Sequence, residues 1–247
     1  AYASFVAIPD APVTISTEAD RGAQEIILKH LVSLFPDDAY CAEEATPTLA
    51  ANQRQNDRCW VIDPIDGTRG FAMKNGEFSV MIGFRIGQQL IIGLVAEPAL
   101  NITTFARIGH GCWVTRDKYP DRSFVSKQAK VSDMTLVLSH SKPGRISAPQ
   151  QALQPAKVVE TYSAGVKLAR VARGEVDCYA NNYPRFSDWD ICAGHLLVLE
   201  AGGKVTELDG KPIVYGKPGY AQAGGLLATN GHVHTEAVAR LKGVEMV

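Results

Sequence analysis

The stretch from Trp60 to Phe71, with the sequence WVIDPIDGTRGF, constrains the fold of this chain most strongly. Its three apolar residues Trp60–Ile62 predict the end of a buried strand, and the Asp-Pro and Asp-Gly pairs that follow predict a sharp turn. Asp63 and Asp66 both lie on this turn, so their carboxylates can converge as oxygen ligands of a hard cation do. A metal site is therefore expected at the end of the strand.

Gly67 and Thr68 follow at a point where a helix or turn is expected to begin. Free backbone N–H groups beside a small hydroxyl suit a phosphate group. Carboxylates, a metal and a phosphate together indicate phosphoryl chemistry. Taken alone, however, the stretch also fits a plain turn.

Composition and charge exclude several classes of function. The 247 residues carry a net charge of −1, which gives no electrostatic footprint for nucleic acid or for a membrane surface. No apolar run approaches the roughly 20 residues of a membrane span, and no signal-peptide pattern is present. The five scattered cysteines fit reduced thiols better than a zinc site or disulfides. We expect a cytoplasmic protein, with an organellar location left open.

Hydrophobic patterns predict an α+β layered protein. The first helix is expected to end at Leu34 and to begin at Thr17 as N-cap, with Asp20 as acidic partner in the first turn. The chain is expected to form one compact unit with two halves, residues 1–131 and residues 132–247. Residues 116–131, at the end of the first half, are expected to form a linker or an exposed loop that leads into the second. Strands are expected at 60–62, 78–84, 89–98, 102–105, 111–114, 135–139, 176–180 and 225–229, and further helices at 164–172, 191–201 and 232–241.

Other acidic residues each have a plain structural interpretation as well as a functional one. An acidic pair such as Glu43 and Glu44 is usually solvated, and Asp188 fits the positive end of the helix expected at 191–201. Asp190 is harder to explain, because small residues follow it and leave room for another backbone or a ligand.

Three blocks of sequence together resemble the signature blocks of the inositol monophosphatase superfamily. The blocks are Glu43-Glu44, Asp63 to Thr68, and Trp189-Asp190 with Ala193-Gly194 and Glu200 to Gly203. They occur in the family's order across nearly the whole chain, and a chance match to all three is improbable. The resemblance implies a Mg²⁺-dependent, lithium-sensitive phosphatase with a layered α/β/α/β/α sandwich fold.

The resemblance also implies the metal ligands, position by position. Glu43 is expected to bind metal 1, Asp63 to bridge metals 1 and 2, and Ile65 to offer its carbonyl to metal 1. Asp66 and Asp190 are expected to bind metal 2. Two or three Mg²⁺ ions would neutralise the phosphate monoester and lower the pKa of a bound water.

The remaining implied catalytic residues are Gly67, Thr68 and Asp20. Gly67 and Thr68 match the family's phosphate-contacting pair, and Thr68 with Asp20 matches the couple that activates water. Glu43 is counted with this catalytic group, and Glu44 is expected to lie behind it. The implied reaction is in-line attack by water, without a phosphoenzyme.

Several positions resemble the branch that hydrolyses 3′-phosphoadenosine 5′-phosphate, a reaction of sulfur metabolism. His140, Lys167 and Arg185 are accordingly expected to bind substrate, whereas Ala164-Gly165 and residues 142–145 depart from the branch's pattern. The positions that carry the resemblance are 69–71, 75–80, 139–140, 166–167 and 184–186.

Two other interpretations stay open. A phosphatase of the same fold would act on inositol phosphates, fructose bisphosphate or histidinol phosphate, with Lys142 a further basic residue for a bisphosphate. The second open interpretation is a non-catalytic scaffold or sensor. All five acidic positions of the family's site are present, however, and a pseudoenzyme is expected to have lost at least one. The partner is expected to be a small phosphorylated molecule, and the chain a monomer or homodimer. The family usually has a helix before the segment that begins here at Ala1, so a truncated or short form is expected.

Overall fold

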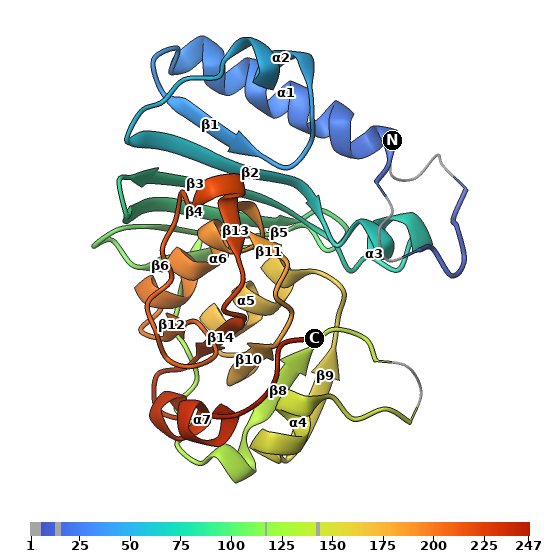
Figure 1. The fold of residues 1–247 in the computed structure, drawn as a ribbon, viewed down its shortest axis with the longest axis vertical. Coiled ribbons are helices and arrows are strands. Elements are labelled where there is room, and N and C mark those ends of the chain that lie inside the picture. Colours follow the sequence, from blue (N-terminus) through green and yellow to red (C-terminus); the bar gives the residue numbers. More distant parts are fainter. Residues whose placement is uncertain (1–5, 13–15, 117, 142–143) are drawn as a thin grey trace.

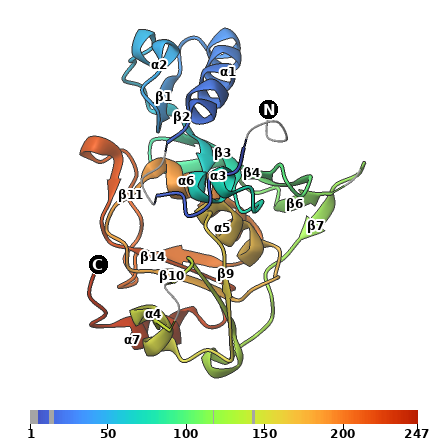
Figure 2. The same cartoon turned by 90° about the vertical axis from the view of Figure 1, so that its right-hand side faces the viewer.

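The computed structural model describes residues 6–12, 16–116, 118–141 and 144–247. The expected entry segment lies partly outside these residues, and Lys142 lies wholly outside them. The elements are layered in the order helix, sheet, helix, sheet, helix (Figure 1), and the turned view in Figure 2 shows the same layers. The predicted α+β layered sandwich is confirmed.

Helices cover both outer faces and fill the space between the sheets (Figure 1). α1 and α2 cover one sheet, α5 and α6 lie between the two sheets, and α4 and α7 pack below the other. Thr17 caps α1 and Asp20 completes its capping box, as predicted. The helices are α1 (Glu18–Leu34), α2 (Pro47–Ala51), α3 (Thr68–Met73), α4 (Ala148–Leu153), α5 (Ala164–Ala172), α6 (Asp188–Glu200) and α7 (His234–Leu241).

The larger sheet has seven strands in chain order, and only its first pair, β1 and β2, is parallel. Strand β2 continues to Asp66, with a register shift between Asp63 and Asp66 against β3. The segment expected as a linker instead contains a strand, β7, because its polar residues form a hairpin with β6 at the sheet edge. The strands are β1 (Ala39–Ala42), β2 (Arg58–Asp66), β3 (Ser79–Ile86), β4 (Gln89–Glu97), β5 (Ile102–Arg107), β6 (Cys112–Thr115) and β7 (Asp121–Ser123).

The smaller sheet has five strands in the order β12-β14-β10-β8-β9. Its strands β8, β9 and β10 run parallel, whereas β14 and β12 are antiparallel to their neighbours. The edge strands β9 and β12 and helix α4 were not expected, because each is too short to show a clear period. The strands are β8 (Thr135–Leu138), β9 (Lys157–Glu160), β10 (Cys178–Asn181), β12 (Lys204–Thr206) and β14 (Leu226–Thr229), with a separate pair β11 (Phe186–Ser187) and β13 (Ala221–Gln222).

Helix α6 lies unusually close to the larger sheet. A Cβ atom at Gly93 of β4 would be 2.4 Å from the carbonyl oxygen of Ala193, so only glycine fits there. Its register partner Gly83 faces Cys192 in the same way. The small residues after Asp190 therefore admit a neighbouring backbone, and this contact holds the first turn of α6 near the end of β2.

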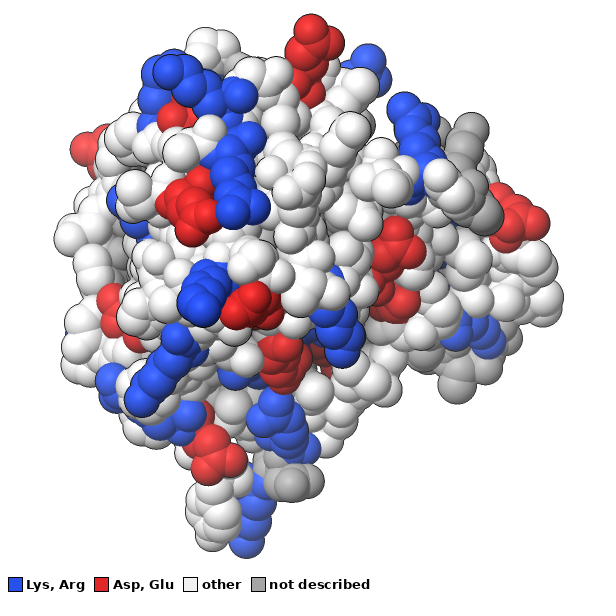
Figure 3. Space-filling model, turned by 90° about the horizontal axis from the view of Figure 1, so that it is seen from below, with Lys and Arg blue, Asp and Glu red and all other residues white. Residues whose placement is uncertain are grey.

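A membrane-spanning helix must be long and apolar, and a surface that binds a polyanion must carry a basic patch. No helix among them is both long and apolar enough to cross a membrane. On the face seen in Figure 3, Lys and Arg side chains are interspersed with Asp and Glu, so the described part of this face has no continuous basic patch.

Candidate active site

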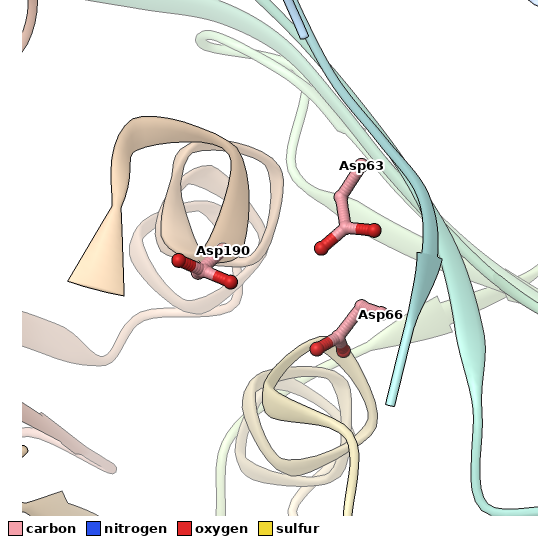
Figure 4. A group of neighbouring side chains, drawn as sticks. All are labelled: Asp63, Asp66 and Asp190. Atoms are coloured by element: carbon pink, nitrogen blue, oxygen red, sulfur yellow. The ribbon is translucent and has the colours of Figure 1, made fainter. Parts of the chain in front are cut away.

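Three carboxylates converge between the end of β2 and the start of α6. Asp63, Asp66 and Asp190 each offer an oxygen within 4.8 Å of the others, and Figure 4 shows the three side chains facing one another. Asp63 Oδ1 accepts a 3.1 Å hydrogen bond from the Ile65 N–H, which closes the turn. Asp190 Oδ2 accepts from the Ser187 N–H at 2.6 Å as part of a capping box, which fixes the carboxylate at the helix start.

Glu43 adds a fourth carboxyl group at the end of β1. The pairing of β1 with β2 and a 3.3 Å bond from its N–H to the Ile62 carbonyl place it beside Asp63, within hydrogen-bond reach of that carboxyl. Loss of solvent around the Glu43 carboxyl, which opens on the cavity, raises its pKa to about 7, although its contact with Asp63 opposes the rise. Burial and the neighbouring carboxylates raise the pKa values of Asp63 and Asp190 as well.

The donor set fits a hard divalent cation. All the converging groups are carboxylate oxygens, the ligands that Mg²⁺ prefers, and burial together with mutual repulsion raises the pKa values of Asp63 and Asp190. A bound cation would hold these groups ionised. Ile65 lies on the same turn, and its carbonyl oxygen lies 3.0 Å from Thr68 Oγ1.

Thr68 and Asp20 meet although they come from different helices. Thr68 is the first residue of α3, and its hydroxyl lies 3.0 Å from Asp20 Oδ1. The other oxygen of Asp20 accepts from the N–H and hydroxyl of Thr17, at 2.8 and 2.5 Å. Gly67 precedes Thr68 with a φ of 83°, and a Cβ there would lie 2.7 Å from the Glu77 carbonyl oxygen. The chain can therefore make this turn only with glycine.

The start of α5 holds Asp66, a contact that the sequence analysis missed. Asp66 accepts from the N–H groups of Ala164 and Gly165 at 3.1 and 2.6 Å, and from the hydroxyls of Ser79, at 3.1 Å, and Ser163. Ser163 also caps α5 by accepting from the Val166 N–H at 2.9 Å. A serine directly before the predicted helix start was the available signal.

A cavity of about 600 Å³ opens beside the carboxylates. Lys167 and Arg185, two of the expected substrate-binding residues, line it, whereas the third, His140, is not among the described lining residues. His140 instead packs against the lining residue Tyr162, with ring centroids 4.3 Å apart, and its Nε2 is 2.7 Å from Glu77 Oε2. The lining residues are Glu43, Asp66, Ser139, Tyr162, Ala164, Lys167, Tyr179, Asn181, Asn182, Tyr183, Arg185, Phe186, Ser187, Trp189, Asp190 and Val247.

Lys167 is the buried cation of this cavity, with only 1% of its surface exposed. Its Nζ donates to the Tyr162 carbonyl at 3.0 Å and lies 5.2 Å from the centre of the Tyr179 ring. Burial lowers its pKa to about 8, while the charges of Asp66 and Glu77 oppose this shift. The ammonium group therefore keeps most of its charge at neutral pH and has donors left for a ligand.

Comparison with known proteins agrees with this geometry. A model of the inositol monophosphatase family matches residues 9–244. The chain is 33% identical over 214 residues to the 3′(2′),5′-bisphosphate nucleotidase CysQ of Salmonella typhimurium, covering 83% of this chain and 80% of that protein. It is 31% identical over 225 residues to the fructose-1,6-bisphosphatase/inositol-1-monophosphatase of Thermotoga maritima, covering 91% and 81%.

Histidinol-phosphatases form a third group of relatives, and they match the chain at a similar level of identity. The histidinol-phosphatase of Streptomyces coelicolor is 31% identical over 238 residues, covering 93% of this chain and 84% of that protein. The solved structure of the inositol monophosphatase from Anabaena has a TM-score of 0.78 at 30% identity, covering 93% of this chain and 88% of that one. The fold, the oxygen-lined cluster and these matches agree: the chain belongs to the inositol monophosphatase family of metal-dependent phosphatases.

Proposed function

We propose that the protein is a Mg²⁺-dependent phosphatase that removes the 3′-phosphate of 3′-phosphoadenosine 5′-phosphate to give AMP and inorganic phosphate. The same reaction on the sulfated form of this nucleotide gives adenosine 5′-phosphosulfate and inorganic phosphate. The observation that carries this proposal is the position of Lys167, a buried cation in the cavity that Asp66 and Asp190 also line. A bisphosphate has a second phosphate away from the one that reacts, and Lys167 can neutralise it. The identity to CysQ supports the same substrate class.

In this proposal, the N-terminal half of the chain, residues 1–131, supplies most of the metal ligands. The C-terminal half, residues 132–247, supplies Asp190 and the residues that contact the substrate. Mg²⁺ held by Glu43, Asp63, Asp66, Asp190 and the Ile65 carbonyl would neutralise the phosphate and lower the pKa of the attacking water. Gly67 and Thr68 present their N–H groups to the phosphate at the start of α3.

Thr68 and Asp20 orient the attacking water. The Asp20 carboxylate accepts the Thr68 hydroxyl proton, so the Thr68 oxygen offers its lone pairs to the water. The water oxygen bonds to phosphorus as the bond from phosphorus to the 3′ oxygen breaks, and a proton from the water moves toward the Thr68 and Asp20 pair. The leaving alkoxide takes a proton from solvent.

The rest of the cavity fits an adenosine group. Its wall includes the aromatic rings of Tyr162, Tyr179, Phe186 and Trp189, which offer apolar contact to a base. Arg185 is exposed at the same cavity, where it can approach a phosphate from solvent. A cavity of about 600 Å³ is of the size that holds a small organic ligand.

Phosphate release with Mg²⁺ tests the proposal. We expect kcat/KM for 3′-phosphoadenosine 5′-phosphate to exceed that for inositol 1-phosphate, inositol 1,4-bisphosphate, fructose 1,6-bisphosphate and histidinol phosphate at least tenfold, about 1.4 kcal/mol of differential transition-state binding. Lithium is expected to inhibit. A preference for any of the other substrates would contradict the nucleotide assignment and leave the metal site standing.

Lys167→Gln tests the role of the lysine. We expect this variant to lose at least tenfold in kcat/KM on 3′-phosphoadenosine 5′-phosphate and much less on 3′-AMP, which lacks the second phosphate. Lys157→Gln, at an exposed position of β9, is the matched control and should behave as the unaltered protein. Equal losses on both nucleotides would show that Lys167 does not contact the second phosphate.

A further inference from the structure

We propose that a second cavity, at the far end of the larger sheet, binds a small oxyanion through Arg85. The cavity has a volume of about 670 Å³, and Arg54, Arg85, Gln88, Tyr215 and Tyr220 are among its lining residues. It opens between the start of β2, the turn from β3 to β4 and the segment 215–220. Neither the proposed function nor its substrate depends on this site.

The second cavity is separate from the candidate active site. Cys59 lines it at the start of β2, whereas Asp66 ends the same strand beside the carboxylate cluster. An extended strand rises about 3.3 Å per residue, so the two ends lie roughly 20 Å apart. One ligand cannot occupy both cavities, and a response at one can be measured without the other.

Arg85 is a buried cation, and at least one N–H donor of its guanidinium group has no hydrogen-bond partner. Its residue is 9% exposed, and its Nη1 donates to the Gly87 carbonyl at 2.8 Å. Its Nε is buried and has no hydrogen-bond partner. Within the described part of the chain, Arg85 takes part in no ion pair.

The buried carboxylate of Asp188 forms no direct ion pair with Arg85, although burial raises the pKa of Asp188 and the charge of Arg85 opposes that rise. Asp188 accepts from the Gly216 N–H and from Gln222 Nε2, both at 2.7 Å, so each of its oxygens already has a neutral donor. A buried guanidinium without a bound anion is costly, and an unpartnered donor adds to the cost. The planar fork of arginine matches the two oxygens of a phosphate or carboxylate.

The walls of the cavity are fixed by hydrogen bonds. Gln88 binds the backbone of Tyr215 twice, donating to its carbonyl and accepting from its N–H, both at 2.9 Å. The Tyr215 hydroxyl is 2.8 Å from His195 Nδ1 of α6. Arg54 lies at the rim with about half of its side chain exposed, 3.5 Å from Asp37 Oδ1, and Asp57 also lines the cavity. The site is therefore preformed, with Arg85 as its buried cation, which suits a small phosphorylated or carboxylated metabolite.

Amide NMR of the Mg²⁺-loaded protein, titrated in separate arms with inorganic phosphate and with citrate, tests this inference. We expect saturable shifts of the Gly87 and Gly216 amides, distinct from any change at Gly67 in the active site. Tighter binding of phosphate identifies a phosphoryl ligand, and tighter binding of citrate a carboxylate ligand. No saturable shift at Gly87 or Gly216 with either anion would overturn the proposal.

Two variants and one control complete the test. Arg85→Gln should weaken binding at these amides at least tenfold, about 1.4 kcal/mol. Arg54→Glu reverses the charge of a half-exposed side chain that lies 3.5 Å from Asp37 Oδ1, and it should weaken binding about threefold. Arg107→Gln, at an exposed position that ends β5, should bind like the unaltered protein. Unchanged binding in Arg85→Gln, or in Arg54→Glu if the first variant fails to fold, would refute the site.

Discussion

The hydroxyl oxygen of Thr68 lies 3.0 Å from Asp20 Oδ1, although the two residues are 48 positions apart in the chain. Asp20 also completes the capping box of α1 through its other oxygen, which accepts from Thr17. One carboxylate thus links the start of the first helix to the start of α3. Asp20 therefore caps α1, as its plain interpretation predicts, and it also contacts Thr68, the residue with which it is proposed to act.

Asp20→Asn is expected to lower kcat by about 10² to 10⁴, the range for loss of a positioned proton acceptor. Thr68→Val should show a similar loss, whereas Thr68→Ser keeps the hydroxyl and should retain most activity. Thr17→Ala is the control for capping: it should cost about 1 kcal/mol of stability and leave kcat nearly unchanged. If Thr17→Ala lost as much activity as Asp20→Asn, the effect would come from the helix start rather than from the contact with Thr68.

Mg²⁺ is expected to raise the melting temperature of the protein in a saturable way, because a cation that binds only the folded state stabilises it by mass action. Asp190→Asn should remove most of this shift. Asn can still accept the hydrogen bond from the Ser187 N–H, so the capping box of α6 should survive. Differential scanning calorimetry with and without a chelator measures the shift. Its absence in the unaltered protein, at millimolar Mg²⁺, would argue against the proposed ligand set.

Much of the fold could be predicted from the sequence where periodicity was strong. Helix α5 was expected at its observed bounds, and the cap of α1 was identified from Thr17 and Asp20. The strand β7 was missed because an edge strand of three residues, mostly exposed, carries no clear alternation. Short elements of this kind form because neighbouring strands offer hydrogen bonds, which local sequence does not encode.

The sequence named the residues of the candidate site one by one, but it did not predict the hydrogen bonds that hold their side chains in place. Resemblance to family blocks named the carboxylates that converge, yet it did not show that the first turn of α5 binds Asp66. That contact joins segments 98 and 99 positions apart, so only tertiary structure reveals it. The same holds for His140, which packs against Tyr162 and is not among the described residues that line the cavity.

Gly93→Ala is expected to destabilise the fold by about 2 kcal/mol or more, since overpacking against fixed atoms typically costs 1 to 3 kcal/mol. The added Cβ would lie 2.4 Å from the Ala193 carbonyl oxygen, a backbone atom of α6 that has little freedom to move. Gly22→Ala provides the opposite control within α1, where a Cβ would meet nothing within 4 Å. That variant should gain about 0.5 to 1 kcal/mol. Urea unfolding of both variants measures the difference, and a neutral Gly93→Ala would mean that α6 does not pack this closely.

His195 should make stability depend on pH in a defined window. Burial lowers its pKa from 6.5 to about 4, and its Nδ1 lies 2.8 Å from the Tyr215 hydroxyl. Between these two pKa values the unfolded chain binds a proton that the folded protein does not, so the stability that is present above pH 6.5 is lost as the pH falls toward 4. The full loss from this one group is about 3 kcal/mol.

Other groups titrate in the same range, and the acidic cluster acts in the opposite sense because its raised pKa values favour the folded state as the pH falls. The free energy of unfolding of the unaltered protein must therefore be compared with that of His195→Gln at each pH. We expect the difference between the two to change by about 1.4 kcal/mol per pH unit between pH 6 and 4.5, with the unaltered protein losing more. A pH-independent difference for His195→Gln would mean that the folded protein protonates His195 as readily as the unfolded chain does.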